Sequence, residues 1–136
     1  MAHHHVEHLH SAEAVDDAIV GEASGRLVVV RFGRGGHADC ARADAALAAA
    51  AERLGPAAAP ALYAVDVEEV QDFNVMYQLE CAPCTVMFFY ENAFVRVCAS
   101  GGRNIDWGAY GGDELAGVVR AVHERAKAGG RYFLLD

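Results

Sequence analysis

Long apolar runs and clusters of positive charge are both missing from this sequence. No stretch approaches the ~18 to 20 uninterrupted apolar residues that a membrane-spanning helix needs. The start also lacks a basic segment followed by an apolar core, so we expect no secretory signal and no membrane contact. Lysine and arginine never form a run longer than a pair, and the formal net charge is −8. Because a protein that holds RNA by its phosphates usually presents a basic face, we expect any RNA contact to be indirect or minor.

Cysteine is too sparse and too irregularly spaced to hold the chain together. At such spacings, four cysteines do not make a disulfide framework for a domain of 136 residues. They are Cys40, Cys81, Cys84 and Cys98. A composition of 54% hydrophobic and 22% charged residues is that of a globular chain that buries a core without such help. We therefore expect one domain over residues 1–136, with mostly reduced thiols, and a monomer in isolation.

Histidine is concentrated at the start of the chain, where His3, His4, His5, His8 and His10 lie. Such a cluster can bind metal, but it precedes every expected core element, and a purification-tag remnant explains part of it equally well. We assign no metal site and no cofactor, and we expect residues 1–10 to be flexible or partly tag-derived.

Hydrophobic periodicity divides the rest of the chain into helices and strands. Apolar residues at helical spacing predict helices, and continuous β-branched or aromatic runs predict buried strands. Helices are expected at 11–21, 39–54, 70–79 and 113–127, and strands at 27–32, 61–66, 85–90 and 94–98. After the first helix the order is β-α-β-α-β-β-α. It predicts an α/β, thioredoxin-like fold with a central mixed four-stranded sheet flanked by helices.

Cys40 lies where a thioredoxin keeps its reactive pair. The strand at 27–32 runs into a glycine-rich loop and then into the helix that Cys40 opens. A thioredoxin has Cys-x-x-Cys at this place, and the helix N-terminus stabilises a thiolate there. Here His37 stands at the first position, and histidine cannot form a mixed disulfide with a substrate. His37 either forms a thiolate–imidazolium pair with Cys40 or is a loop histidine without a role.

A second cysteine pair has redox spacing in the wrong place. Cys81 and Cys84 precede a strand instead of opening a helix, so no helix N-terminus lowers a thiol pKa there. Pro83 stands where thioredoxin-like folds carry a cis-proline, and we predict a cis Ala82–Pro83 bond. The fold then brings Cys84 close to Cys40. The sequence leaves two alternatives open: a Cys40–Cys84 disulfide, or two buried, reduced thiols.

A glycine-flanked loop near the last helix is the candidate partner-binding site. Its candidate residues are Arg103, Asn104, Trp107 and Tyr110. Arginine and large aromatic residues dominate binding hot spots when they are exposed. The alternative is that Trp107 packs under the last helix.

Three blocks of the sequence resemble one family. They are residues 28–33, 65–77 and 83–90, with shorter matches at 8–10 and 104–107. Together they resemble the Dim/Dib family, the thioredoxin-like proteins of the U5 small nuclear ribonucleoprotein. The resemblance runs from about His8 to Gly130. Its most specific parts are Asp-Phe-Asn-x-Met-Tyr at 72–77 and Pro-Cys-Thr-Val-Met-Phe-Phe at 83–89.

The resemblance implies a non-catalytic, nuclear protein subunit of the U4/U6·U5 tri-snRNP. Such a subunit acts in pre-mRNA splicing by binding large splicing proteins before spliceosome activation, and it lacks oxidoreductase activity. Cys40 and Cys84 match two family cysteines that approach one another. Three departures stand out: residues 36–40 lack the family's aromatic residue and proline, the following helix is rich in alanine, and the basic, tyrosine-rich tail is missing.

Two other functions stay open on the residues alone. A thiol–disulfide oxidoreductase using Cys40 with Cys84 needs an accessible thiol of low pKa and a resolving partner. A thioredoxin-fold adaptor of some other complex needs neither. Without the resemblance, the sequence predicts only an acidic binding module that has the fold and lacks the dithiol.

Overall fold

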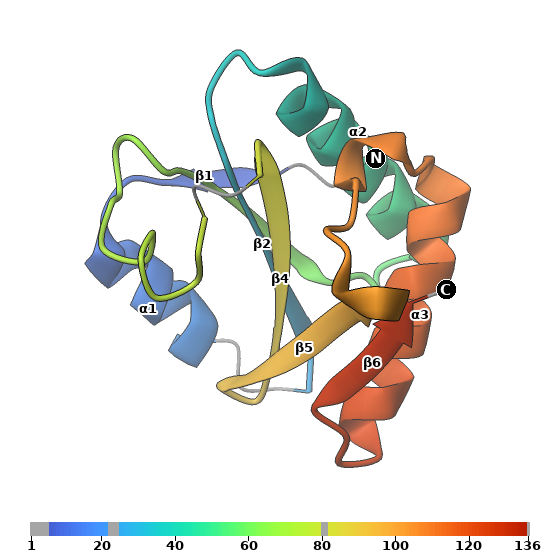
Figure 1. Cartoon of the computed structure of the whole chain (residues 1–136). Helices are drawn as coiled ribbons and strands as arrows, with labels where there is room; N and C mark the ends of the chain where they lie inside the picture. Colours follow the sequence, from blue (N-terminus) through green and yellow to red (C-terminus); the bar gives the residue numbers. More distant parts are fainter. Residues whose placement is uncertain (1–5, 22–24, 80–81, 136) are drawn as a thin grey trace.

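The computed structural model describes residues 6–21, 25–79 and 82–135. These residues form a single mixed sheet with helices on both faces (Figure 1). The strand order is β1-β3-β2-β4-β5-β6. The strands are β1 (Glu7–Leu9), β2 (Leu27–Gly33), β3 (Ala61–Asp66), β4 (Cys84–Tyr90), β5 (Ala93–Ala99) and β6 (Tyr132–Leu135). The helices are α1 (Ala12–Gly21), α2 (Ala38–Leu54) and α3 (Gly112–Lys127), with short 3₁₀ turns η1 (Ser100–Gly102) and η2 (Trp107–Ala109).

Strand β2 lies at the centre of the sheet because its sequence is apolar on both faces. All seven of its residues are buried. It pairs in parallel with β3 and antiparallel with β4. A strand covered on both sides reads as a hydrophobic run instead of an alternating pattern, as Leu27 to Phe32 does apart from Arg31. The expected strands and the helices at 11–21, 39–54 and 113–127 are thus present, and the α/β thioredoxin-like fold class is confirmed.

Each face of the sheet has its own hydrophobic core. One core lies under α2 and α3 and contains Val29, Phe88 and Val119. The other lies under α1 and the segment after β3, and contains Val30 and Phe89. In the described part of the chain, no helix is long and apolar enough to cross a membrane.

The sheet has six strands, so the expected four-stranded sheet was wrong. Strand β1 pairs in parallel with β3, and β6 pairs in parallel with β5, which adds one short strand at each edge. Part of the segment expected to be flexible or tag-derived, Glu7–Leu9, is therefore ordered sheet. Edge strands this short contain too few residues to show a period, so hydrophobic patterning does not reveal them.

The helix expected at 70–79 was also wrong, because this segment is a chain of turns. Its backbone N–H groups bond at mixed intervals: Asn74 to Gln71, Tyr77 to Phe73, and Leu79 to Asn74. Gln78 has a positive φ of 55°, which a helix interior does not accept. Phe73 and Tyr77 still point inward and stack with ring centroids 6.0 Å apart. Several tight turns, and not one helix, thus turn these two rings inward, whereas Met76 at the same spacing is 66% exposed.

Candidate functional site

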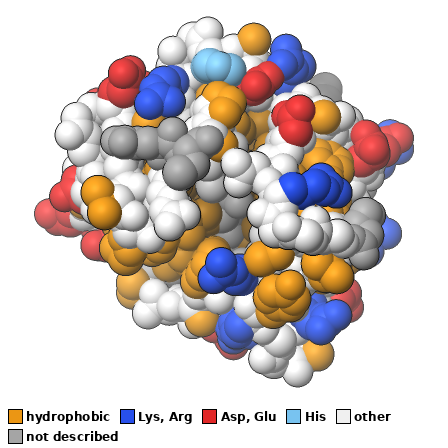
Figure 2. Space-filling model, viewed as in Figure 1, with side chains coloured by type: hydrophobic (Ala, Val, Ile, Leu, Met, Phe, Trp, Pro, Cys, Tyr) orange, Lys and Arg blue, Asp and Glu red, His pale blue; other side chains and the backbone are white. Residues whose placement is uncertain are grey.

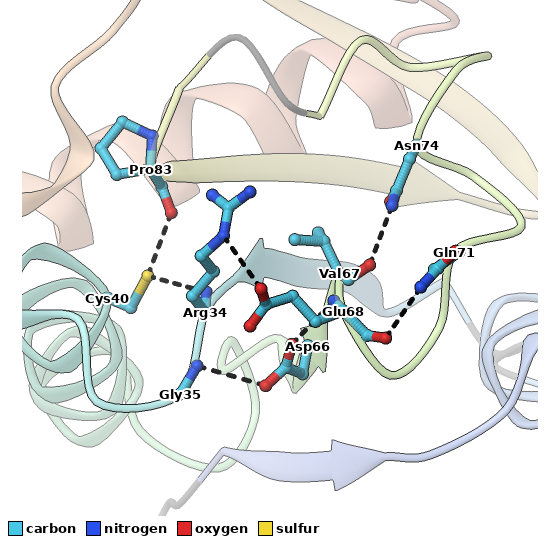
Figure 3. Close-up of polar contacts among 9 residues, drawn as sticks. All are labelled: Arg34, Gly35, Cys40, Asp66, Val67, Glu68, Gln71, Asn74 and Pro83. Carbon is cyan, nitrogen blue, oxygen red and sulfur yellow. Dashed lines mark hydrogen bonds and ion pairs between the residues drawn. The ribbon is translucent and has the colours of Figure 1, made fainter.

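The Cys40 thiol joins two loops at the position of the thioredoxin active site. Cys40 lies in the first turn of α2 and is 2% exposed. Its Sγ accepts a hydrogen bond from the backbone N–H of Arg34 at 3.4 Å and donates one to the carbonyl of Pro83 at 3.2 Å (Figure 3). A thiol in this position connects the loop after β2 to the segment before β4, and its S–H group donates a hydrogen bond to a carbonyl.

Gly33 is a glycine because Cys40 leaves no room for a side chain. A Cβ built on Gly33 would lie 2.4 Å from the Cys40 Sγ and 2.9 Å from Nη1 of Arg31. Real Cβ atoms do not approach other atoms this closely. The end of β2 and the start of α2 are therefore in direct contact at this position.

A buried ion pair lies beneath the two thiols. The Arg31 guanidinium donates to both carboxylate oxygens of Asp44 at 2.7 Å each. The Arg31 side chain is 5% exposed and that of Asp44 is 23% exposed. Burial lowers the pKa of Arg31, but the hydrogen bond and the charge of Asp44 raise it further, so its net pKa is raised. This fork-shaped pairing fixes α2 to the central strand.

Cys84 carries a thiol that stays protonated at neutral pH. Burial raises its pKa to about 12, and the neighbouring Cys40 adds to the effect, while the positive charge of Arg31 opposes it. A thiolate is the reactive form of cysteine, so Cys84 is a poor nucleophile. The opposing effect of Arg31 is too small to offset burial at this position.

Cys40 and Cys84 are neighbours, as the fold leads us to expect. The Cys40 thiol donates a hydrogen bond to the carbonyl of Pro83, the residue directly before Cys84. Both are free thiols, so of the two alternatives the structure contains the two buried, reduced thiols and not the disulfide. Cys81, the other half of the second cysteine pair, lies outside the described residues.

The cis peptide bond predicted before Pro83 was wrong. The described residues include Ala82 and Pro83, and no cis peptide bond occurs among them. The trans form of an X-Pro bond is lower in energy by about 0.5–1 kcal/mol, and only surrounding contacts can reverse that preference. Here the Pro83 carbonyl faces Cys40 and accepts a hydrogen bond from its thiol.

His37 has a structural role that the sequence did not reveal. It is the N-cap of α2, and its Nδ1 accepts a hydrogen bond from the backbone N–H of Asp39 at 3.1 Å. The imidazole therefore satisfies one of the free N–H groups at the helix start. It does not pair with the Cys40 thiol, whose partners are Arg34 and Pro83. Histidine is not among the usual capping residues, so no sequence rule indicated this.

Asp66 connects the end of β3 to the loop that precedes α2 (Figure 3). Its carboxylate accepts hydrogen bonds from the backbone N–H groups of Glu68 at 2.8 Å and Gly35 at 3.3 Å. These bonds, that of Glu68 first, lower the pKa of Asp66, although partial burial opposes them. Sequence reasoning overlooked Asp66, and an acidic residue at the last position of a buried strand was the available signal.

The turns after β3 are held to the same loop. The backbone N–H of Val67 donates to the Gly33 carbonyl at 2.9 Å. The buried amide of Asn74 donates to the Val67 carbonyl at 2.8 Å (Figure 3). Arg34 and Glu68 add an ion pair at 3.9 Å. Residues 66–74 therefore support the loop that precedes Cys40.

The expected partner-binding residues divide by exposure. Arg103 and Asn104 are exposed, and Tyr110 is half-buried. Trp107 is 4% exposed and packs against Phe88 with ring centroids 5.8 Å apart, so of the two alternatives for this residue the surface position is wrong and the packed one holds. Its turn, η2, rests on α2 and β4 and places the indole in the core.

A shallow hollow of about 290 Å³ opens between the candidate site and this loop. Asp39, Pro83, Asn104 and Asp106 are among the residues that line it. Among the described residues, no group of three or more histidine, cysteine, aspartate or glutamate side chains could hold a metal ion. The hollow lies beside Cys84 and offers a partner protein a surface formed by the start of α2, the segment before β4 and the loop at 104–107.

Comparison with known proteins identifies the family. A family model described as "Mitosis protein DIM1" matches residues 5–132. The chain belongs to the DIM1 family. The mitosis protein dim1 of Schizosaccharomyces pombe is 38% identical over 124 residues, which cover 90% of this chain and 84% of that protein. The spliceosomal protein DIB1 of Eremothecium gossypii is 46% identical over 97 residues, which cover 71% of this chain and 65% of that protein.

Solved structures similar to this DIM1-family chain are thioredoxins. Chloroplastic thioredoxin z has a TM-score of 0.64 and 18% identity, and the match covers 88% of this chain and 96% of that one. Oxidised thioredoxin from Plasmodium falciparum has a TM-score of 0.62 and 18% identity, with 85% and 96% covered. At this identity the likeness shows the fold alone. Within that fold, the DIM1-family chain has a capping histidine and a buried thiol where a thioredoxin has two reactive cysteines.

Proposed function

We propose that this chain is a non-catalytic protein subunit of the splicing machinery that acts in pre-mRNA splicing by binding other proteins. The observation that carries the proposal is its similarity, over most of its length, to relatives named spliceosomal proteins. The proposed partners are large splicing-factor proteins of the U4/U6·U5 tri-snRNP, which the chain contacts before spliceosome activation. Its proposed location is the nucleus, and in isolation it is a monomer.

The chemistry of the site supports binding over redox catalysis. A thiol oxidoreductase needs one accessible thiol of low pKa and a second thiol to resolve the mixed disulfide. Cys40 is buried and bonded to a backbone carbonyl. Cys84 is buried with its pKa raised to about 12, and His37 replaces the attacking cysteine. The site thus has a thioredoxin frame whose thiols serve as packing and hydrogen-bonding groups.

Exposed groups around the hollow supply the proposed contacts. Arg103 and Asn104 project from one loop, and Tyr110 packs on Trp107 with ring centroids 5.9 Å apart. An arginine with a neighbouring polar amide and a partly exposed ring has the composition of a binding hot spot. We propose that a splicing protein covers this loop.

Affinity purification of the tagged full chain from nuclear extract of its source organism tests the proposed function. We expect U5 and U4/U6 RNAs and their proteins to be recovered with the chain. The Cys40→Ala/Cys84→Ala variant should recover them equally well, because no thiol chemistry is required. Arg103→Glu should reduce recovery, whereas Arg120→Glu, an exposed charge reversal on α3, should not.

Two results would contradict the proposal. Recovery of spliceosomal RNAs no greater than with an unrelated tagged protein would remove the splicing assignment. Recovery of client proteins through disulfides that reductant breaks, and that Cys40→Ala abolishes, would favour the oxidoreductase. Turnover in an insulin-reduction assay would point to the same activity.

A further inference from the structure

One half of one sheet face has no helix over it in the described part of the chain. Along β5 and β6, Val95, Val97, Phe133 and Leu135 face the core under α2 and α3. Side chains alternate along a strand, so the residues between them face the opposite side. These are Phe94, Arg96 and Cys98 of β5, with Tyr132 and Leu134 of β6. Arg96 pairs with Tyr132 across the strands, and Cys98 with Leu134.

The core under α1 stops at the border of this face. Phe89 of β4 is buried and contacts Phe94 of β5, with ring centroids 5.8 Å apart. Beyond that contact the apolar side chains are open to solvent: Phe94 is 40% exposed, Leu134 46% and Met76 66%. In Figure 2 hydrophobic side chains gather over the lower part of the molecule, where β5 and β6 lie. Exposed apolar residues grouped in this way mark interaction sites more often than scattered ones do.

Two hollows lie along β5, and because they share part of their lining we treat them together as one trough. The first, of about 410 Å³, reaches from Met76 and Phe94 to Cys98. The second, of about 240 Å³, reaches from Arg96 to Arg103. Both are lined by Thr85, Val86, Arg96, Val97 and Cys98. We call this surface, from Met76 and Phe94 past Arg96 to Arg103, the β5 trough.

The charge of the β5 trough is opposite to that of the whole chain. Among the described residues that line it, the charged ones are Arg96 and Arg103, and none is aspartate or glutamate. No carboxylate of the described residues forms an ion pair with either arginine. The chain as a whole has 19 acidic and 11 basic residues. In Figure 2 the side chains among the hydrophobic patches over β5 and β6 are more often blue than red. The trough therefore complements an apolar ligand that carries negative charge.

We propose that the β5 trough binds a segment of another protein that carries apolar side chains and at least one carboxylate. The apolar side chains cover Phe94 and Met76, which removes exposed hydrocarbon from water. A carboxylate between them pairs with the Arg96 guanidinium, which can donate two parallel hydrogen bonds. An RNA strand fits less well, since its affinity depends on neutralising several phosphates, and the trough offers two cations in an apolar lining.

The inference goes beyond the proposed splicing role and does not depend on it. A segment bound in the trough is a property of the isolated chain, so it can be measured without nuclear extract. Failure of the purification from extract would leave the trough prediction intact, and failure of the peptide experiment would leave the splicing assignment intact.

Selection from a random peptide library displayed on phage, with the intact chain as target, tests the proposal. We expect the enriched peptides to combine apolar residues with aspartate or glutamate. Synthesised and labelled, they should bind roughly tenfold or more weakly to Arg96→Glu, because reversing this charge replaces attraction with repulsion. Phe94→Ala should also weaken binding. Arg120→Glu, an equal charge reversal on α3 at the opposite face of the sheet, should bind as the unaltered chain does.

Four outcomes would overturn the proposal. They are enrichment of no peptide, binding that Arg96→Glu leaves unchanged, tighter binding of a single-stranded RNA oligonucleotide at the same arginine, and a self-associated dimer in sedimentation that Arg96→Glu dissociates. The last two would assign the trough to RNA or to a second copy of the chain. Circular dichroism of each variant establishes that a loss of binding is not a loss of fold.

Discussion

Arg31 and Asp44 are joined by two hydrogen bonds of 2.7 Å in the interior of the molecule, one residue on the central strand and the other on α2. The pair places the Arg31 guanidinium close to Cys40 and Cys84, with its charge balanced by the Asp44 carboxylate. Arg31 is 4% exposed, and in this position its charge depends on the carboxylate for compensation.

Asp44→Ala should destabilise the chain strongly. The substitution leaves the Arg31 guanidinium buried and unpaired, which reduces the free energy of unfolding by about 3 kcal/mol or more. Urea unfolding followed by circular dichroism measures this. The double variant Arg31→Met/Asp44→Leu should recover most of the loss, since it removes both charges. A double variant no more stable than Asp44→Ala would show that the pair contributes more than mutual compensation.

Gly33→Ala should destabilise the chain by overpacking. Its new methyl group would meet the Cys40 Sγ at 2.4 Å, and inserting a group into a filled site costs about 1–3 kcal/mol. The double variant Gly33→Ala/Cys40→Ala should lose less than the two single losses added together, because it removes the closest clash. Strictly additive losses in urea unfolding would contradict the contact.

Stability should fall at alkaline pH because of Cys84. The ordinary pKa of the thiol is 9.0, and in the folded chain burial raises it to about 12. The folded state therefore holds the proton more tightly than the unfolded state. The stability that the raised Cys84 pKa contributes is fully present below pH 9.0 and is lost as the pH rises toward about 12. Between about pH 8 and about pH 10.5, Cys84→Ala should lose less free energy of unfolding than the unaltered chain. Equal slopes for both proteins would contradict the raised pKa.

Trp107 and Arg103 should behave in opposite ways when each is truncated. Trp107→Ala removes a buried indole and should reduce the free energy of unfolding by about 3–5 kcal/mol, with Trp107→Phe losing less. Arg103→Ala, at an exposed position in the same loop, should stay within about 0.5 kcal/mol of the unaltered chain. Thermal unfolding of the three variants measures the difference. A tolerated Trp107→Ala would mean that the indole is not part of the core.

The sequence predicted the central elements well because they are long and strongly patterned. The strand at 61–66 has the expected bounds, and the helix at 39–54 begins one residue earlier than expected. The prediction from hydrophobic periodicity failed where the apolar residues have helical spacing but the backbone does not form helical hydrogen bonds. The residues at 71–79 keep helical spacing but turn irregularly, because Gln78 has a positive φ and the Asn74 amide bonds to the Val67 carbonyl.

The candidate site was predicted in position and less well in detail. Cys40, Cys84 and Pro83 converge as the fold order implies. The trans bond at Pro83, the capping role of His37 and the burial of Trp107 depend on contacts between residues far apart in the chain or on unusual capping chemistry. No local pattern encodes these contacts, so they required the structure.

The capping histidine has a consequence for any attempt to restore redox chemistry. His37→Cys would recreate the Cys-x-x-Cys spacing, but it would also remove the imidazole nitrogen that accepts the Asp39 N–H at the start of α2. The second thiol of the new motif, that of Cys40, would still be buried and would still donate a hydrogen bond to the Pro83 carbonyl. Restoring the Cys-x-x-Cys sequence would therefore destabilise the N-terminus of α2 without producing a reactive dithiol.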